Sequence, residues 1–370
     1  MSKYFPQGIA NDEAFCNREN ERSAVSACIE SHEHLVLIAP RRYGKSSLIS
    51  QVLKENHFPG TCIDLFFVLS QSEVTKSIAE GVSRIVNEIM PATKAAGKKI
   101  LQSVATLNPK LTINLLGQRI ELSAKQSEEK SISELLLALD EIARKTKKTC
   151  VLVLDEFQQI GELKENHAIE AAIRHAVERS TNVSYIFCGS KHHLLNEMFS
   201  DKSRPLYHLC DLMMINRIST VSYQNFLNKM AKSKWKQHLN EDALSEIIYL
   251  TENHSYYINA LCRRLWREKH APLISEVRKS WNEYVIQQGA WIIDELSRLT
   301  LNRRKVLVTL ASEKTKEPQG ESFCKKARLS ASGVKRALND LIKSDMVLKS
   351  QDGYYHILDP AISYFIRNSH

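Results

Sequence analysis

The tripeptide Gly44-Lys45-Ser46 follows an apolar run, "HLVLIA", and opens a segment with helical spacing. Backbone N–H groups at the start of such a helix can surround a phosphate, while a lysine reaches its oxygens and a hydroxyl ligates Mg²⁺. The pattern G-x-x-x-x-G-K-[ST] has glycine first, where this chain has Ala39. Alanine costs little there unless that position needs a positive φ. We therefore predict a working phosphate-binding loop.

The second candidate is "VLVLDEFQQ", an apolar strand that ends in Asp155 and Glu156. This is the Walker B arrangement, in which Asp155 and Ser46 would hold Mg²⁺ and Glu156 would polarise the attacking water. A buried strand that simply ends in acids at a helix cap is the structural alternative. Both motifs on one parallel sheet favour the catalytic interpretation.

A third strand, "VSYIFCGS", ends in Ser190, which would lie near the γ-phosphate or the water, or would simply cap the next helix. We predict Glu156, Lys45 and Ser190 as the catalytic set. Four arginines are candidates for charge stabilisation during phosphoryl transfer: Arg41, Arg42, Arg174 and Arg204. The predicted nucleotide contacts are Ala39, Pro40, Arg41, Arg42, Tyr43, Gly44, Lys45, Ser46 and Ser47.

The elements that must position these residues alternate between buried strands and amphipathic helices up to about residue 215. This alternation predicts an α/β fold, a parallel sheet covered by helices on both faces. Residues 92–130 interrupt it, with a possible hairpin around "LTINLLGQRIELSA", and a capping box of Ser131 with Glu134 predicts the next helix. A P-loop ATPase domain is therefore expected over residues 1–215.

The rest of the chain changes class twice. Residues 216–295 read as helices alone, which predicts an all-α lid, and "ISEVRKSWNEYVIQQGAWIIDEL" reads as one of them. Residues 296–370 read as three helices followed by a hairpin that turns at Gln351-Asp352-Gly353. Three helices and a wing predict a winged-helix domain.

Charge is concentrated in that last part. The net charge of the 370 residues is +9, and residues 301–370 hold thirteen Lys and Arg against seven Asp and Glu. Within "SASGVKRALNDLIKS", Lys335, Arg336 and Lys343 face outward on the expected recognition helix, where they could contact duplex DNA. A winged helix that packs on its own core or binds protein is the alternative.

Composition indicates an ordinary globular protein, with 43% hydrophobic and 25% charged residues. No apolar run approaches a membrane span and the first residues lack the apolar core of a signal peptide, so a cytoplasmic protein without membrane contact is expected. The eight cysteines show no metal-binding spacing. We interpret them as reduced residues of the core.

The chain resembles the predominantly archaeal ATPase family, which is similar to the STAND signalling ATPases and to the AAA+ class with the origin-recognition ATPases. The resemblance rests on "FPQGIANDEAFCNRENER", "APRRYGKSSL", "LDEFQQI", "YIFCGSK" with "RPLYH", "TENHSYYINALCRRLW" and "YYHILDPAISYFI". These segments run in order over nearly the whole chain. Ala-Pro-Arg-Arg is a common form of the loop in that family, which favours a working site.

The resemblance implies that Phe15 and Arg18 lie near the adenine or the loop, and that His254 to Tyr257 form a nucleotide-facing turn of the lid. Two positions depart from the family: His208-Leu209 stand where Gly-Arg is common, and Ser255 stands where proline is common. The first departure implies slow hydrolysis if that arginine contacts the γ-phosphate in relatives.

Three functions are consistent with these residues. The leading one is a switch that binds and hydrolyses ATP with Mg²⁺, between the ATPase domain and the lid, and passes its nucleotide state through the winged helix to a protein partner or another copy of itself. The second is an ATP-gated DNA-binding protein of the initiator or transposition-helper kind. The third is an adaptor that holds nucleotide without hydrolysing it.

Overall fold

The structure, a computed structural model, describes residues 4–90, 102, 111–116, 119–124, 130–350 and 352–369. These residues form two compact units, which are described separately. One unit comprises residues 18–41 and 45–216, and the other comprises residues 1–17, 42–44 and 217–370. The predicted division into three domains remains a prediction, since the lid and the winged helix share one unit.

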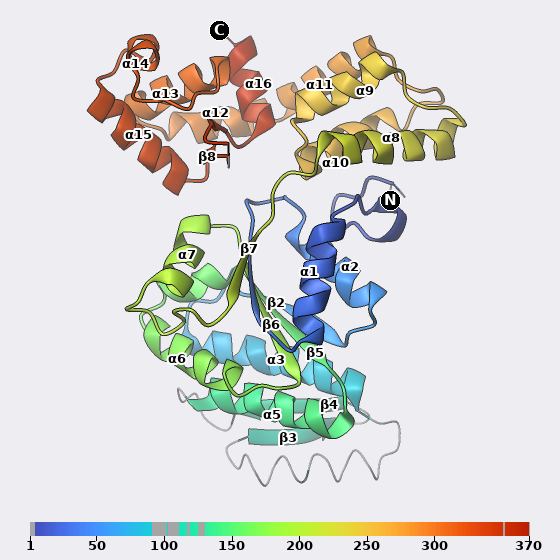
Figure 1. Ribbon diagram of the computed structural model, residues 1–370, viewed down its shortest axis with the longest axis vertical. Coiled ribbons are helices and arrows are strands. Elements are labelled where there is room, and N and C mark those ends of the chain that lie inside the picture. Colours follow the sequence, from blue (N-terminus) through green and yellow to red (C-terminus); the bar gives the residue numbers. More distant parts are fainter. Residues whose placement is uncertain are drawn as a thin grey trace. The chain divides into compact units, whose positions relative to one another are not determined.

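The first unit is built on a parallel sheet whose strand order is β2-β5-β6-β1-β7 (Figure 1). Its strands are β1 (Leu35–Ile38), β2 (Gly60–Asp64), β5 (Cys150–Asp155), β6 (Val183–Gly189) and β7 (Asp211–Met214). The three central strands are buried along their apolar lengths because helices cover both faces of the sheet. The predicted α/β fold is confirmed.

Helices alternate with these strands along the chain (Figure 1). They are α1 (Glu19–Glu30), α2 (Lys45–Glu55), α3 (Gln71–Ile89), α5 (Lys130–Thr146), α6 (Asn166–Val177) and α7 (His192–Ser200). Alternate strand residues, such as Val36 and Ile38, join one core cluster with the buried faces of α3, α5 and α6. Their neighbours Leu35 and Leu37 are buried on the opposite face of the sheet.

Several local predictions are corrected. The strand predicted from "TCIDLFFVL" ends at Asp64, and the rest is a turn in which Phe67 is 82% exposed. Helix α5 begins at Lys130, so Ser131 lies inside it and is not its N-cap. The possible hairpin is confirmed as antiparallel strands β3 (Leu111–Leu116) and β4 (Arg119–Ala124).

The helices expected in residues 216–295 are present, with one break. They are α8 (Thr220–Trp235), α9 (Glu241–Thr251), α10 (Ser255–Leu265), α11 (Ile274–Gln287) and α12 (Gly289–Ser297). The single long helix expected over the last two is interrupted at Gln288, whose backbone (φ −86°, ψ −4°) forms a turn between them, although its N–H still donates to the Tyr284 carbonyl oxygen. Side-chain caps such as Asn240 on the Asp242 N–H begin the individual helices.

The last part is a winged helix with an additional helix. It contains α13 (Leu301–Ser312), α14 (Glu321–Ala327), α15 (Ala331–Lys343), β8 (Val347–Lys349), β9 (Tyr355–Ile357) and α16 (Pro360–Asn368). Gly353 makes the hairpin turn at φ +89°, and the predicted turn residue Gln351 lies outside the described residues. Helix α16 was not predicted from the sequence, although Asp359 caps it and Pro360 occupies its first turn.

The cysteines are only partly core residues. Cys16, Cys150, Cys188 and Cys262 are buried as expected, but Cys62 is exposed because β2 is an edge strand and alternate side chains leave the core. In the described part of the chain, no three side chains of His, Cys, Asp or Glu gather into a metal site. No described helix is both long and apolar enough to span a bilayer.

Candidate functional site

The loop between β1 and α2 has its left-handed backbone away from the unusual alanine. Arg42 has φ +65° and Gly44 has φ +91°, whereas Ala39 is not among the residues with positive φ. A Cβ on Gly44 would meet no atom within 4 Å, so glycine serves the backbone conformation there and not a close approach. This explains why the loop tolerates alanine at its first position.

Lys45 and Ser46 are the first residues of helix α2, and both side chains contact neighbouring residues of the expected nucleotide site. Lys45 is 8% exposed, and its ammonium donates to the carbonyl oxygen of Ala39 at 3.1 Å. The exposed Ser46 hydroxyl lies 3.5 Å from Asp155 Oδ2, which joins the first turn of α2 to the end of β5. The structure therefore brings together the two residues predicted to hold Mg²⁺.

Asp155 lies in an environment that resists a lone negative charge. Burial raises the pKa of its carboxyl group above the ordinary value, while the nearby Lys45 ammonium and a hydrogen bond from the Glu156 N–H act in the opposite direction. Asp64, at the end of β2, pairs with Asp155 in the sheet and adds to the negative potential. A cation beside Asp155 would offset both effects, so the oxygen donors fit Mg²⁺.

Glu156 is held by two donors from neighbouring elements. Its backbone is left-handed (φ 51°, ψ 38°), and its Oε2 accepts from the Ser190 hydroxyl at 3.0 Å and from the Gln158 amide. The Ser190 hydroxyl also accepts from Arg41 Nε at 3.4 Å. Helix α7 has Lys191 as its N-cap, so the alternative in which Ser190 simply caps that helix is not supported.

Gln158 is a site residue that was not predicted from the sequence. It is fully buried, and its Oε1 lies beside Gly189, where an added Cβ would come within 2.0 Å of that oxygen. Gly189 thus leaves the space in which Gln158 reaches Glu156. In the sequence, Gln158 is simply a glutamine two positions after Glu156, and glutamine is not a residue type that indicates a catalytic role.

The four candidate arginines have different surroundings. Arg41 is exposed beside Ser190 and the Phe66 ring, with its guanidinium 5.8 Å from the ring centre. Arg174 donates to the carbonyl oxygens of Pro205 and Tyr207, and Arg204 pairs with the buried Glu170. Arg42 lies in the unit that comprises residues 1–17, 42–44 and 217–370, here called the C-terminal unit, with its guanidinium 4.2 Å from the Tyr256 ring centre. Of the three candidates in the unit of the sheet, only Arg41 lies near the predicted catalytic set.

The remaining predicted contacts are distributed between the two units. Pro40 and Ser47 are half-buried in the unit of the sheet, while Tyr43 belongs to the other unit and is 3% exposed. Phe15 is half-buried, also in the C-terminal unit. Arg18, 4% exposed, pairs with Glu21 and donates to the Asn216 carbonyl oxygen, which indicates a structural role in its own unit.

The family model of an ATPase domain predominantly from Archaea matches residues 15–261. This chain belongs to that ATPase family. A second model, described as a probable winged helix domain, matches residues 293–368 and agrees with α13 to α16. A comparison with curated protein sequences found no match.

Solved structures share the fold over almost the whole length of this ATPase. A Walker-type ATPase of Pyrococcus abyssi superposes with a TM-score of 0.70 at 18% identity, over 99% of each chain. The ORC2 protein of Aeropyrum pernix, solved in ADPNP–ADP complexes, gives a TM-score of 0.57 at 11% identity, over 99% of this chain and 97% of that one. At these identities the likeness concerns the fold.

The two departures from the family pattern have local explanations. His208, where the family commonly has glycine, has φ +52°, a left-handed backbone that glycine adopts without strain and that histidine adopts more readily than most residues. Ser255, where proline is common, is the first residue of α10, a position that suits proline. Here its hydroxyl accepts from the Tyr223 hydroxyl at 3.0 Å instead.

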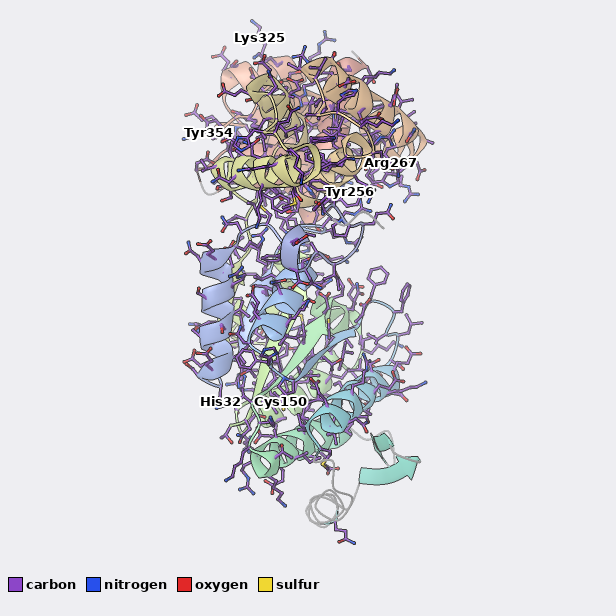
Figure 2. All side chains as sticks on the ribbon, turned by 90° about the vertical axis from the view of Figure 1, so that its right-hand side faces the viewer. His32, Cys150, Tyr256, Arg267, Lys325 and Tyr354 are labelled. Carbon is purple, nitrogen blue, oxygen red and sulfur yellow. The ribbon has the colours of Figure 1, made fainter. Side chains whose placement is uncertain are left out.

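The predicted DNA-contacting residues are exposed on the winged helix. Lys335, Arg336 and Lys343 all lie on α15, whose N-cap Ser330 accepts from the Gly333 N–H. Lys325 on α14 extends away from the ribbon in Figure 2. The ammonium of Lys316 lies 4.7 Å from the ring centre of Tyr354, at the wing.

Proposed function

We propose that this protein is a switch that binds ATP with Mg²⁺ and hydrolyses it slowly, and that its lid and winged helix pass the nucleotide state to a partner. The observation that carries the proposal is the convergence of Lys45, Ser46, Asp155, Glu156 and Ser190 at one edge of the sheet, from one helix and the ends of two adjacent strands. The family membership supports the same chemistry.

The residues of the loop would bind and orient the nucleotide. The N–H groups at the start of α2 and the Lys45 ammonium would bind the phosphates, and one donor of that ammonium already holds the loop through the Ala39 carbonyl oxygen. Ser46 and Asp155 would hold Mg²⁺, which when bound neutralises charge on the phosphate oxygens. Arg41, beside Ser190, would stabilise charge on the transferred group.

Glu156 would accept a proton from the attacking water. Ser190 and Gln158 both bind its Oε2, which leaves Oε1 as the oxygen with which it can orient the water. Their two hydrogen bonds fix the carboxylate while the left-handed backbone of Glu156 directs the side chain from the end of β5. Loss of either donor would reduce turnover more than nucleotide binding.

The proposal is tested by comparing the wild type with Glu156→Gln and Lys45→Ala. We expect Glu156→Gln to bind a fluorescent ATP analogue with unchanged affinity and to lose at least about 100-fold in turnover, since general-base contributions are of this size. Lys45→Ala should lose binding. If the wild type and Glu156→Gln hydrolyse ATP at the same measurable rate, hydrolysis by this site is refuted. If both of these proteins bind ATP tightly and neither hydrolyses it, the nucleotide-holding adaptor is favoured.

A second candidate function is nucleotide-gated binding of duplex DNA through the winged helix. It is supported by the exposure of Lys335, Arg336 and Lys343 along α15, with Lys316 beside the wing. We expect Lys335→Glu/Arg336→Glu to abolish duplex binding in a titration at low salt, with wild-type affinity falling steeply as salt rises. The exposed pair Lys229→Glu/Lys232→Glu on α8 is the control with the same charge change. Equal loss in both variants would indicate nonspecific charge attraction.

A further inference from the structure

Arg217 joins three segments of the C-terminal unit through a single side chain. Its Nε donates to the Tyr43 hydroxyl at 3.0 Å, and its Nη1 donates to the backbone oxygen and the carboxylate of Glu252 at 2.8 and 3.0 Å. Its Nη2 donates to the carbonyl oxygen of Leu358 at 2.8 Å. Only 18% of the side chain is exposed. The three partners belong to the phosphate loop, the end of α9 and the segment between β9 and α16.

A second set of contacts leads from the same loop to the same winged helix. The Tyr43 ring lies 4.9 Å from the His254 ring, and His254 lies 4.9 Å from the ring of Tyr257 (centre-to-centre distances). The hydroxyl of Tyr257 in turn donates to Asp359, the residue that caps α16. The loop tip is therefore joined to the winged helix by both hydrogen bonds and packed rings.

These contacts hold the part of the loop with the unusual backbone. Arg42 and Gly44 have φ of +65° and +91°, and between them Tyr43 is buried against this network. Arg42 itself lies against the Tyr256 ring, with its guanidinium 4.2 Å from the ring centre (Figure 2 labels Tyr256). A loop held in this form needs less ordering when a phosphate binds, which raises affinity. The winged helix therefore contributes to the geometry of a loop more than 300 residues away in sequence.

We propose that Arg217 is a positioning residue that couples the phosphate loop to the winged helix, so that bound nucleotide and the docked β9–α16 segment stabilise each other. This inference rests on the proposed nucleotide-binding function and specifies how that site is regulated. Coupling between two sites is reciprocal, so whatever holds the winged helix against this network tightens nucleotide binding, and whatever removes it loosens nucleotide binding by the same factor. A partner that competes for the segment around Leu358 would thus promote nucleotide release.

The guanidinium is suited to this role because its three nitrogens lie in one plane and can donate hydrogen bonds to three partners at the same time. Glu252 fixes one side of it, and the same carboxylate also faces Lys314 at 3.6 Å and Arg367, on α16, at 3.9 Å. A lysine at position 217 would keep the positive charge but reach fewer of these partners. Arg217→Lys therefore tests whether the coupling needs the hydrogen bonds of the guanidinium or only its positive charge.

The test uses the full chain and two readouts, the affinity for ATP with Mg²⁺ and the hydrogen exchange of the backbone amides in β9 and α16. In the wild type we expect nucleotide to slow that exchange. Tyr43→Phe removes the hydroxyl that meets Arg217 and keeps the ring on His254, so we expect about a tenfold loss in affinity and no nucleotide-dependent change of exchange in β9 and α16. Arg217→Lys should behave in the same way.

Tyr185→Phe is the matched control because it also removes a buried tyrosine hydroxyl with a hydrogen bond, to Ser180 at 3.1 Å, in the unit of the sheet. It should keep both the affinity and the nucleotide-dependent exchange. Wild-type behaviour of Tyr43→Phe in both readouts would overturn the coupling while leaving the proposed function intact. If the wild type does not bind ATP, the proposed function fails and the coupling fails with it.

Discussion

Gly44→Ala tests whether the left-handed backbone of the loop, and not the identity of its first residue, is what nucleotide binding requires. At φ +91°, a side chain costs about 1–2 kcal/mol because Cβ approaches the backbone. No atom lies within 4 Å of the added Cβ, so no steric collision adds to this penalty. A cost of this size corresponds to roughly 5- to 30-fold in an equilibrium constant.

The chain contains a matched control for this change. Gly353 in the wing has φ +89° and likewise no atom within 4 Å of an added Cβ, so Gly353→Ala imposes the same backbone cost far along the chain from the phosphate loop. The free loop of Gly44→Ala can relax away from φ +91°, whereas we expect bound nucleotide to require it, so ATP binding should weaken by up to roughly 5- to 30-fold in a fluorescence titration. Gly353→Ala should lower the stability of the wing and change the affinity much less than Gly44→Ala does.

Two results would refute this reasoning. Wild-type affinity in Gly44→Ala, together with wild-type stability in urea, would mean that the loop does not need positive φ at this residue. A loss well above 100-fold would mean that the added methyl group collides with the nucleotide, which a backbone penalty of about 1–2 kcal/mol does not produce. Ala39→Gly supplies the complementary result, since Ala39 does not have positive φ and we expect no gain in affinity from glycine.

Three further outcomes follow from other parts of the structure. Gly189→Ala should lower turnover about tenfold or more with little effect on ATP affinity, because its Cβ would displace Gln158 from Glu156. Asp140→Ala should cost about 3 kcal/mol or more in urea unfolding, because the carboxylate accepts from the backbone N–H groups of residues 181, 182 and 183, whereas Asp140→Asn should cost less. Burial and neighbouring cations lower the pKa of His254 to about 3 and that of His356 to about 4, both below the ordinary 6.5. Between pH 7 and pH 5 the unfolded chain therefore binds protons at these histidines that the folded chain does not. The free energy of unfolding should fall by about 2 kcal/mol per histidine over this range. His356→Gln should make the free energy of unfolding in guanidinium less dependent on pH.

The sequence predicts most of the sheet because buried parallel strands leave a simple signal. Runs such as "CVLVLD" are apolar at every position, and the helices between them repeat their apolar residues every three to four positions. The missed strand β7 is an edge strand with mostly exposed side chains, so neither signal is present. Helix α1 was missed for a similar reason, since only Val25 and Ile29 are buried along its length.

The candidate site was predictable where its chemistry depends on residue type. A lysine, a hydroxyl and two carboxylates at strand and helix ends can be identified without coordinates. Backbone conformation was not predictable at Arg42, Glu156 or His208, because all three are left-handed without being glycine. The roles of Arg217 and Gln158 were not predictable either. Arg217 acts on Tyr43, which is distant in sequence, and the contact of Gln158 with Glu156 depends on the direction of a buried side chain.

Strand order determines how these residues combine. Strand β6 lies between β1 and β5 and pairs with both in parallel, so the carboxyl ends of the three strands lie at the same edge of the sheet. At these ends Ile38 of β1 pairs with Gly189 of β6, and Leu154 of β5 pairs with Phe187 of β6. The ends of β1 and β5 are then separated by two strand spacings, about 10 Å, and Ser190 at the end of β6 lies between them. Ser46 spans that separation from the first turn of α2 and meets Asp155, while Ser190 meets Glu156. With β5 directly beside β1, the same motifs would lie about 5 Å apart and Ser190 could not come between them. The sheet order is therefore what makes a serine on a third strand part of a site that the two sequence motifs define.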